Sequence, residues 1–392
     1  MVTPIVSVVI PTHERAGYAV PTVRALLGLS AAIEVVVSDS SKQDSISSNF
    51  ESAIHTGQLK ILRPMRKMSV VDNFNFALAA ATGRYVCFIG DDDFVSSDVV
   101  SLAKWAELNA IDAVKFTFPS LYFWPDFRHR VEGAAIAGSV RTSAYSGRIS
   151  IHDSRRSARD ALQNLGAGPL DMPRVYAGLV SRSLIEKITA KYGSLFGGVS
   201  PDVYSALLIA IEAETCVKVD YPVVIPGASG ASTAGLSAQG RHVGGLRDNP
   251  HIGAFENLLW DPRIPEFYSV PTVWGFSILK AAERAKVPSK NIGFGRLYLK
   301  CIVFQYAYWR DTLRAAHATV IGNFSVLAFA RVLVDMAREV IWLASQVVKR
   351  FQVRIRGQRD LTVQYDLGDT AEASRYLETI RSRLPLRLEL DR

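Results

Sequence analysis

The stretch of sequence that decides the fold is Arg84-Tyr-Val-Cys-Phe-Ile-Gly-Asp-Asp-Asp-Phe94. Its apolar residues 86–89 include β-branched and aromatic side chains, which predicts a short strand buried on both faces. The strand leads directly into three consecutive carboxylates, Asp91, Asp92 and Asp93. A buried strand that ends in clustered acids is typical of a ligand site at the edge of a sheet.

The three adjacent carboxylates have two interpretations. Their mutual repulsion is costly at the rim of a core unless a cation or several hydrogen-bond donors offset it, and such oxygen ligands suit Mg²⁺ or Mn²⁺. These ions take few protein ligands and complete their shell with water and substrate phosphates. Alternatively, the acids form a solvated turn before a helix that starts near Ser96 and Ser97. The pattern alone leaves both interpretations open.

The composition is that of a folded protein kept in a reducing compartment. The chain has 392 residues, 48% hydrophobic and 21% charged, which allows two domains or one large domain with an appendage. Its three cysteines are widely spaced in apolar stretches and predict buried thiols rather than a disulfide framework or a zinc site. The N-terminus lacks the basic segment of a signal peptide, and the C-terminal apolar runs are shorter than the ~18 residues of a membrane span. We therefore expect a cytoplasmic protein without a transmembrane helix.

The net charge of +8 is unevenly distributed. Lys and Arg number 25 against 26 Asp and Glu in residues 1–279, and 20 against 11 in residues 280–392. A basic part beside a near-neutral part is compatible with an anionic partner, phospholipid or nucleic acid, or with an ordinary solvated surface.

Strands and helices alternate through the N-terminal half. Apolar runs at residues 4–11, 33–39 and 59–62 predict strands, and residues 20–29 and 69–82 predict helices. This alternation predicts a doubly wound sheet of the α/β class, which binds ligands at the carboxyl ends of its strands. Asp39 and the acidic triplet both lie at such ends. The sequence contains neither a G-x-G-x-x-G fingerprint nor a Walker-type loop, so phosphates must be held by a metal and by basic side chains.

A second candidate carboxylate lies farther along the chain. Gly197-Gly-Val-Ser-Pro-Asp202 predicts a helix start, with Ser200 as N-cap and Pro201 at the first helical position. Asp202 in the first turn is favoured by the helix dipole alone, but a carboxylate after a glycine loop also suits a general base. The stretch of small residues at 226–240 is interpreted as a lid over the site or as a linker.

We place the domain boundary at this stretch, with an α/β domain at residues 1–235 and a mainly helical region at residues 236–392. Helices are predicted at residues 273–285, 296–315, 324–350 and 370–384. The third of these has a wide apolar face. Such a face packs against neighbouring helices in most proteins and in others lies in the interface of an anionic membrane.

Four segments in this order resemble the family 2 glycosyltransferases of the GT-A fold. They are Val6-Ser-Val-Val-Ile-Pro-Thr-His-Glu-Arg15, Val35-Val-Val-Ser-Asp-Ser-Ser41, residues 73–81, and Thr82-Gly-Arg-Tyr-Val-Cys-Phe-Ile-Gly-Asp-Asp-Asp93. The similarity is close over about residues 4–100 and continues loosely to about residue 235. It implies a Rossmann-like, doubly wound mixed sheet and a metal-dependent inverting transfer of a sugar from a nucleotide-sugar donor, with a UDP-sugar as the expected donor.

The resemblance also implies roles for single residues. Asp39 matches the acid that reads the nucleotide base, and Asp91 falls where the family contacts the ribose. Asp92 falls on the ligand of Mn²⁺ or Mg²⁺, with Asp93 in support, His242 as the nearest histidine for the metal shell, and Asp202 near the catalytic base. The residues expected to bind the nucleotide sugar are Pro11, Thr12, Arg15, Asp39, Arg66, Asn73 and Asp91.

For the acceptor we expect a glycan or a lipid-linked molecule of cell-surface polysaccharide synthesis, and no nucleic acid as partner. The basic C-terminal helices then suggest a peripheral position at the inner face of the cytoplasmic membrane. Two alternatives stay open. Gly90 replaces the first aspartate of the usual D-x-D, and Glu14 stands where the family often has asparagine, which is compatible with a non-catalytic, nucleotide-binding or scaffold member. A nucleotidyltransferase is less compatible, because the first loop lacks a glycine-rich basic cradle.

Overall fold

The computed structural model describes residues 3–239, 243–255, 257–321, 326–356 and 361–391. Within these residues a nine-stranded mixed sheet has the order β15-β9-β11-β6-β10-β4-β1-β2-β3. The four N-terminal strands pair in parallel, and β10 lies antiparallel between β4 and β6. Its strands are β1 (Val6–Thr12), β2 (Ile33–Asp39), β3 (Leu59–Leu62), β4 (Tyr85–Phe88), β6 (Ala113–Phe116), β9 (Ile149–Ile151), β10 (Leu179–Ser181), β11 (Cys216–Val219) and β15 (Leu390–Asp391).

Helices cover both faces of this sheet, because its central strands are apolar on both sides. Val9 and Val86 point into one core cluster, whereas the neighbouring Val8 and Cys87 point into the other. The first cluster is covered by α3 (Val70–Ala80), α5 (Ser154–Leu162), α6 (Arg182–Tyr192), α7 (Pro201–Glu212) and α10 (Val270–Arg284). The second is covered by α1 (Ala16–Leu27), α2 (Glu51–His55) and α4 (Asp98–Leu108). This architecture confirms the α/β class with a large mixed sheet.

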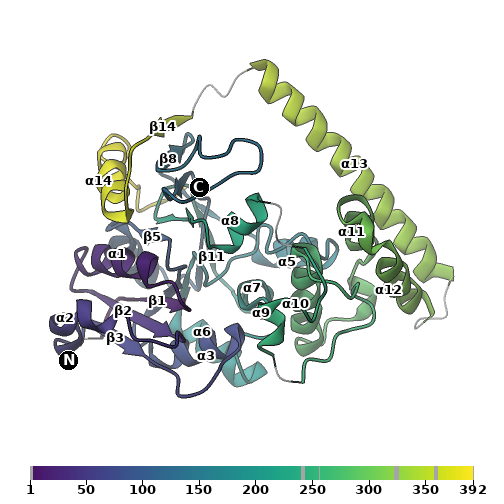
Figure 1. Ribbon diagram of the computed structural model, residues 1–392, viewed down its shortest axis with the longest axis horizontal. Coiled ribbons are helices and arrows are strands. Elements are labelled where there is room, and N and C mark those ends of the chain that lie inside the picture. The colour runs from purple at the N-terminus through teal and green to yellow at the C-terminus, as the bar shows by residue number, and fades with distance from the viewer. Residues whose placement is uncertain (1–2, 240–242, 256, 322–325, 357–360, 392) are drawn as a thin grey trace.

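Two small sheets are formed by strands that come after the acidic triplet in the chain. One pairs β5 (Phe94–Val95) with β12 (Val224–Ile225), and the other has the order β13-β7-β8-β14. The strands of the second are β7 (Ser120–Phe123), β8 (Ser139–Thr142), β13 (Gly227–Ala228) and β14 (Thr362–Gln364). Phe94, Tyr122 and Trp124 form a third core with Leu377 of α14 (Thr370–Arg381). The C-terminal segment thus returns to the N-terminal half, where β14 and α14 lie beside β8 and α1 (Figure 1).

The predicted helix at residues 296–315 is wrong as one element. The chain forms α11 (Gly295–Phe304), a 3₁₀ turn at Tyr306–Tyr308, and α12 (Trp309–Ile321). The Tyr308 ring stacks on Phe267 with 4.4 Å between ring centroids, so tertiary packing fixes a turn in a segment that has no glycine or proline signal. The shorter helices α8 (Thr233–Ala238) and α9 (Pro250–Gly253) lie between β13 and α10 in the chain.

The longest helix, α13 (Val326–Arg356), packs against α11 (Figure 1). Its packed side carries buried Asp335 and Glu339 together with half-buried Val332. Glu339 is fully buried and forms ion pairs with Arg296 at 2.6 Å and Lys300 at 3.0 Å. Apolar side chains on its other faces are exposed: Phe329, Leu333, Val334, Val340, Ile341, Trp342 and Val348. None of the helices within the described ranges combines the length and the hydropathy of a membrane span.

Candidate active site

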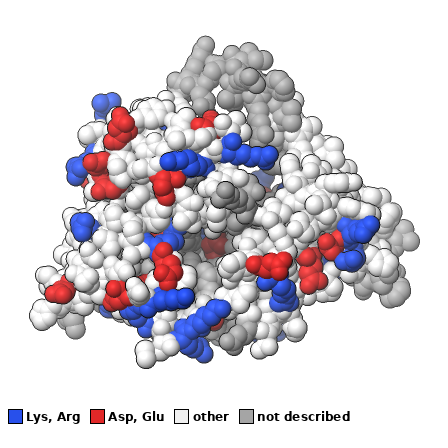
Figure 2. Space-filling model, in the orientation of Figure 1, with Lys and Arg blue, Asp and Glu red and all other residues white. Residues whose placement is uncertain are grey.

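The acidic triplet lies at the carboxyl edge of the sheet, directly after β4. Asp91, Asp92 and Asp93 are each 5% exposed. Strand β4 pairs in parallel with β1, so the end of β1 and the following loop come to lie beside the triplet. In the space-filling view, acidic side chains are visible inside a central hollow, while both signs of charge are interspersed on the surrounding surface (Figure 2).

Arg15 bridges two of the three carboxylates. Its Nε atom donates to Asp91 at 2.7 Å, and its Nη2 atom lies 3.1 Å from Asp92. Thr12 at the end of β1 donates a hydrogen bond of 2.6 Å to Asp91. Burial nevertheless raises the pKa of Asp91 to about 6, with Arg15 acting against this shift and Asp92 adding to it. The triplet is therefore only partly neutralised by Arg15.

Asp92 and Asp93 are held by the segment that follows β12. Ser229 donates its backbone N–H (3.2 Å) and its hydroxyl (2.6 Å) to Asp92 Oδ2. The two oxygens of Asp93 accept from the backbone N–H groups of Gly90 and Gly227, both at 2.7 Å. Burial, and then the charge of Asp92, raise the pKa of Asp93 to about 7. Asp93 therefore serves as an anchor that joins the triplet to β13.

The donors around Asp92 engage only one of its two carboxylate oxygens. Asp92 Oδ2 is engaged by Ser229 and Arg15, whereas Oδ1 accepts no hydrogen bond from any described residue. The described part of the chain contains no group of three or more His, Cys, Asp and Glu side chains placed to hold a metal. Mg²⁺ and Mn²⁺ are held by one or two carboxylates with substrate phosphates completing the shell, so the residues fit that kind of ion.

Arg15 also presents an unused donor at this place. Within the described residues, its buried Nη1 atom has no hydrogen-bond partner. A buried guanidinium donor without a partner is costly and is satisfied by an anionic oxygen. The site thus combines a carboxylate oxygen suited to a cation with a guanidinium N–H suited to a phosphate.

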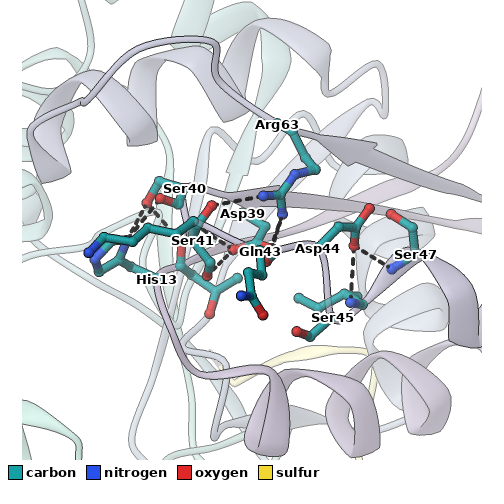
Figure 3. A network of polar contacts seen from close by, with 12 residues as sticks. His13, Asp39, Ser40, Ser41, Gln43, Asp44, Ser45, Ser47 and Arg63 are labelled. Atoms are coloured by element: carbon teal, nitrogen blue, oxygen red, sulfur yellow. Dashed lines mark hydrogen bonds and ion pairs between the residues drawn. The ribbon is translucent and has the colours of Figure 1, made fainter.

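Asp39 ends β2 beside Thr12, with which it is in register. Its carboxylate receives an ion pair of 2.6 Å from Arg63 Nη1 and a backbone hydrogen bond of 2.9 Å from Ser41 (Figure 3). Arg63 also donates to the carbonyl oxygen of Ser41 at 2.8 Å. His13 contacts the carbonyl oxygen of Ser40 at 3.0 Å in the same network. Arg63 and Ser41 thus fix the orientation of Asp39 at the strand end.

Asp202 lies in the first turn of α7, on the sheet face that the first core cluster covers. Ser200 donates a 2.6 Å hydrogen bond to one of its oxygens. Its charge acts on Arg174 and Tyr176, and the Tyr176 hydroxyl in turn lies 3.5 Å from Asp93. Tyr176 therefore lies between the triplet and the helix that carries Asp202.

The other predicted site residues are placed as follows. Pro11 precedes Thr12 in β1, and Arg66 is exposed in the segment between β3 and α3. Asn73 is buried on α3 and accepts a 2.6 Å hydrogen bond from Ser38, so it supports the strand end that carries Asp39. His242 lies outside the described residues.

Sequence reasoning did not identify Ser229, Gly227 or Tyr176. Ser229 and Gly227 belong to the stretch of small residues interpreted as a lid or linker. The structure instead forms β13 and α8 there and buries Ser229 against the triplet. More than 130 residues separate Gly227 and Ser229 from the triplet in sequence, so no local pattern predicts these contacts.

Comparison with known proteins places these observations in a family context. Residues 7–144 match the family model described as glycosyl transferase family 2. A comparison with curated protein sequences gave no match.

Similar solved structures include TarS 1–349 from S. aureus in complex with UDP-GlcNAc, with 12% identity, a TM-score of 0.46, and coverage of 93% of this chain and 97% of that chain. The mannosyltransferase PcManGT from Pyrobaculum calidifontis, in complex with GDP-Man and Mn²⁺, has 15% identity and a TM-score of 0.41, with coverage of 98% and 88%. Against TarS 1–349 in complex with UDP, the identity is 14% and the TM-score 0.38, with coverage of 57% and 61%. The chain spans 55% of a further TarS structure.

Proposed function

We propose that this chain, whose residues 7–144 match the glycosyl transferase family 2 model, transfers a sugar from a nucleotide-sugar donor to the hydroxyl of a glycan or lipid-linked acceptor, with inversion at the anomeric centre. The donor is a UDP-sugar in this proposal, and Mn²⁺ or Mg²⁺ assists the reaction. The observation that carries the proposal is the convergence of Arg15, Thr12 and the triplet at the carboxyl edge, with Asp39 beside them.

In this proposal, different residues bind the nucleoside, the diphosphate and the acceptor hydroxyl. Asp39 accepts from the base and Asp91 faces the ribose, while Arg15 directs its free Nη1 donor toward the diphosphate. Asp92 and supporting Asp93 would hold the divalent ion, which supplies Lewis-acid neutralisation of the leaving diphosphate when bound. Asp202 accepts the proton of the acceptor hydroxyl from the opposite side. Its single hydrogen bond to Ser200 leaves the other oxygen of the carboxylate available for this role.

The first test replaces Asp92 and Asp202 separately by asparagine. Asp92→Asn removes the anionic ligand, so we expect loss of turnover and of Mn²⁺-dependent donor binding, with thermal unfolding close to that of the wild type. Asp202→Asn should abolish transfer by at least about 100-fold, in line with loss of a general base, and leave donor binding intact. Transfer is measured as the release of the nucleoside diphosphate, UDP or GDP, from the sugar donor in the presence of a panel of glycan acceptors. Undiminished release by Asp92→Asn, or by the wild type in excess chelator, would show that transfer does not depend on a metal bound at Asp92.

We further propose that the exposed apolar side chains of α13 lie in the interface of an anionic membrane. Two observations support this membrane face. The apolar side chains are exposed over several turns, and this part of the chain has an excess of basic residues. The side of α13 that carries Glu339 is used against α11, and most of its apolar residues are left facing outward. This arrangement suits a helix that meets lipid rather than a helix buried in the protein.

Flotation with liposomes tests this surface. Leu333 and Ile341 are 49% and 69% exposed, so Leu333→Gln with Ile341→Gln removes apolar area with little effect on the fold. We expect the full-length wild type to float with vesicles that contain phosphatidylglycerol and the double variant to float several-fold less. Leu108→Gln on α4 is the matched control, because that side chain is 86% exposed on a different helix. Equal flotation of all three proteins would exclude α13 as the membrane face.

A further inference from the structure

A second cavity lies near the carboxyl ends of β6 and β11. Its volume is about 330 Å³, and its polar lining contains Lys115, Arg174 and Lys218. Lys115 and Lys218 are in register on the two parallel strands, so their side chains leave the same face of the sheet side by side. The aromatic residues Phe116 and Phe118 complete one wall. Three cations therefore line a pocket that no role described above uses.

The positive charge of this pocket is only partly compensated. Lys115 forms an ion pair of 2.6 Å with Asp171, which also lies 3.8 Å from His152 and whose side chain is 62% exposed. Among the described residues, neither Arg174 nor Lys218 has an ion pair. Arg174 lies over the Phe118 ring, 5.0 Å from its centroid, which leaves the N–H groups at the edge of the guanidinium free to donate. Burial lowers the pKa of Arg174, although Asp202, Tyr176 and Asp93 act against this shift.

The backbone around the pocket is strained in an unusual way. Phe118, Leu170 and Ala177 all line the cavity and have φ values of 53°, 46° and 50°. Residues with a Cβ atom rarely adopt this left-handed conformation, because it is sterically strained for them. Retained strain of this kind clusters at binding sites, where the surrounding structure holds the backbone in place. It is an observation independent of the charges.

The pocket adjoins the candidate active site on the side of Asp202. Arg174 is two residues from Tyr176, whose hydroxyl is 3.5 Å from Asp93. The carboxylates of Asp93 and Asp202 are both close enough to Arg174 to act on its charge. Arg174 therefore connects the lining of the basic pocket with the carboxylates of the candidate active site.

We propose that this pocket binds an anionic group of the acceptor, a phosphate or a carboxylate, so that the preferred acceptor carries negative charge. The inference rests on the proposed glycosyltransferase function and names its acceptor class. An anion bound here pairs with Arg174 and Lys218, neither of which has an ion pair among the described residues. A neutral acceptor fills the same volume but leaves both charges unpaired.

Calorimetric titration of the full-length protein tests the proposal at constant ionic strength, which keeps screening equal among the probes. The probes are a tetramer of glycerol phosphate, tetragalacturonic acid and neutral maltotetraose. We expect one anionic probe to bind at least tenfold more tightly than maltotetraose, and the better of the two identifies phosphate or carboxylate as the recognised group. Lys218→Gln and Arg174→Gln should each weaken that binding by tenfold or more.

Lys104→Gln supplies the matched control, because it removes the same charge from the exposed side of α4 on the other face of the sheet. UDP binding should be unchanged in all variants. If Arg174→Gln does not fold, Lys218→Gln alone tests the proposal, because the Lys218 side chain is only part-buried and its replacement perturbs the fold less. Equal binding of charged and neutral probes, or equal affinity in Lys218→Gln and Lys104→Gln, would overturn the proposal. A chain that binds the anionic probe through these residues but transfers no sugar would instead refute the transferase function and leave the anion pocket standing.

Discussion

At the scale of single residues, Gly90 explains how three carboxylates share one strand end. A Cβ atom at this position would lie 2.8 Å from the Tyr176 hydroxyl and 3.0 Å from Asp92 Oδ1. A side chain at position 90 would therefore enter a filled space. The glycine is required by the positions of Tyr176 and Asp92.

Gly90→Ala should consequently displace Tyr176 or Asp92. We expect turnover to fall by tenfold or more and the free energy of unfolding to fall by about 1–3 kcal/mol, the usual cost of overpacking. Nucleotide release and chemical denaturation measure the two effects. Gly17→Ala is the control, because a Cβ atom there meets nothing within 4 Å. Equal activity and stability in both variants would contradict the steric role of Gly90.

The raised pKa of Asp93, about 7, predicts a pH dependence of stability. The folded protein keeps a proton on this carboxyl at pH values where the unfolded chain has released it, so the folded state loses stability as pH rises from about 4 to about 7. Asp93→Asn removes this titration. The stability of the wild type relative to Asp93→Asn should therefore fall between pH 5 and pH 8, as measured by urea denaturation. A difference that rises with pH over this range would show that the pKa of Asp93 is lowered instead.

The carboxylates of the candidate site could be predicted from the sequence, because each follows a local pattern of a strand or a helix start. The triplet follows a buried apolar run, Asp39 ends another, and Asp202 follows a helix-start pattern. Ser229 and Tyr176 were missed because their significance comes from contacts made across distant parts of the chain. The bridging position of Arg15 likewise depends on the pairing of β1 with β4.

At the scale of elements, α13 shows how a hydrophobic pattern can identify a helix but not its packed side. The apolar stripe predicted the helix, and packing on neighbours was the commoner use of such a stripe. The structure packs a side that carries Val332 and buried Glu339, which pairs with Arg296 and Lys300 of α11, and leaves most of the apolar residues exposed. The helix therefore depends on an ion-pair network for its attachment.

Glu339→Gln should loosen α13 from α11. Removing one partner of a buried ion pair leaves two cations uncompensated, and we expect the free energy of unfolding to fall by on the order of 3 kcal/mol. Guanidinium denaturation measures the change, with exposed Glu186→Gln on α6 as the control for a neutralised glutamate. Unchanged stability in Glu339→Gln would mean that α13 is attached by other contacts.

At the scale of the whole molecule, the C-terminal segment belongs to the sheets of the N-terminal half. Strand β14 pairs with β8, and β15 pairs with β9 at the end of the large sheet. Strand pairing between such distant segments is set by tertiary contacts, and the short strands involved have no clear periodicity in sequence. Functional tests of α11–α13 therefore need substitutions within the full chain, because truncation removes strands that the sheets use.

The proposed role of the acidic triplet is to hold a divalent ion against the diphosphate of a sugar donor. Calorimetric titration of UDP-sugars into the wild type and Asp92→Asn, each with Mn²⁺ and with excess chelator, tests it most directly. We predict that Mn²⁺ tightens donor binding to the wild type by at least tenfold and has little effect on Asp92→Asn. Donor affinity that is the same in Mn²⁺ and in chelator, or the same Mn²⁺ effect in both proteins, would contradict the account.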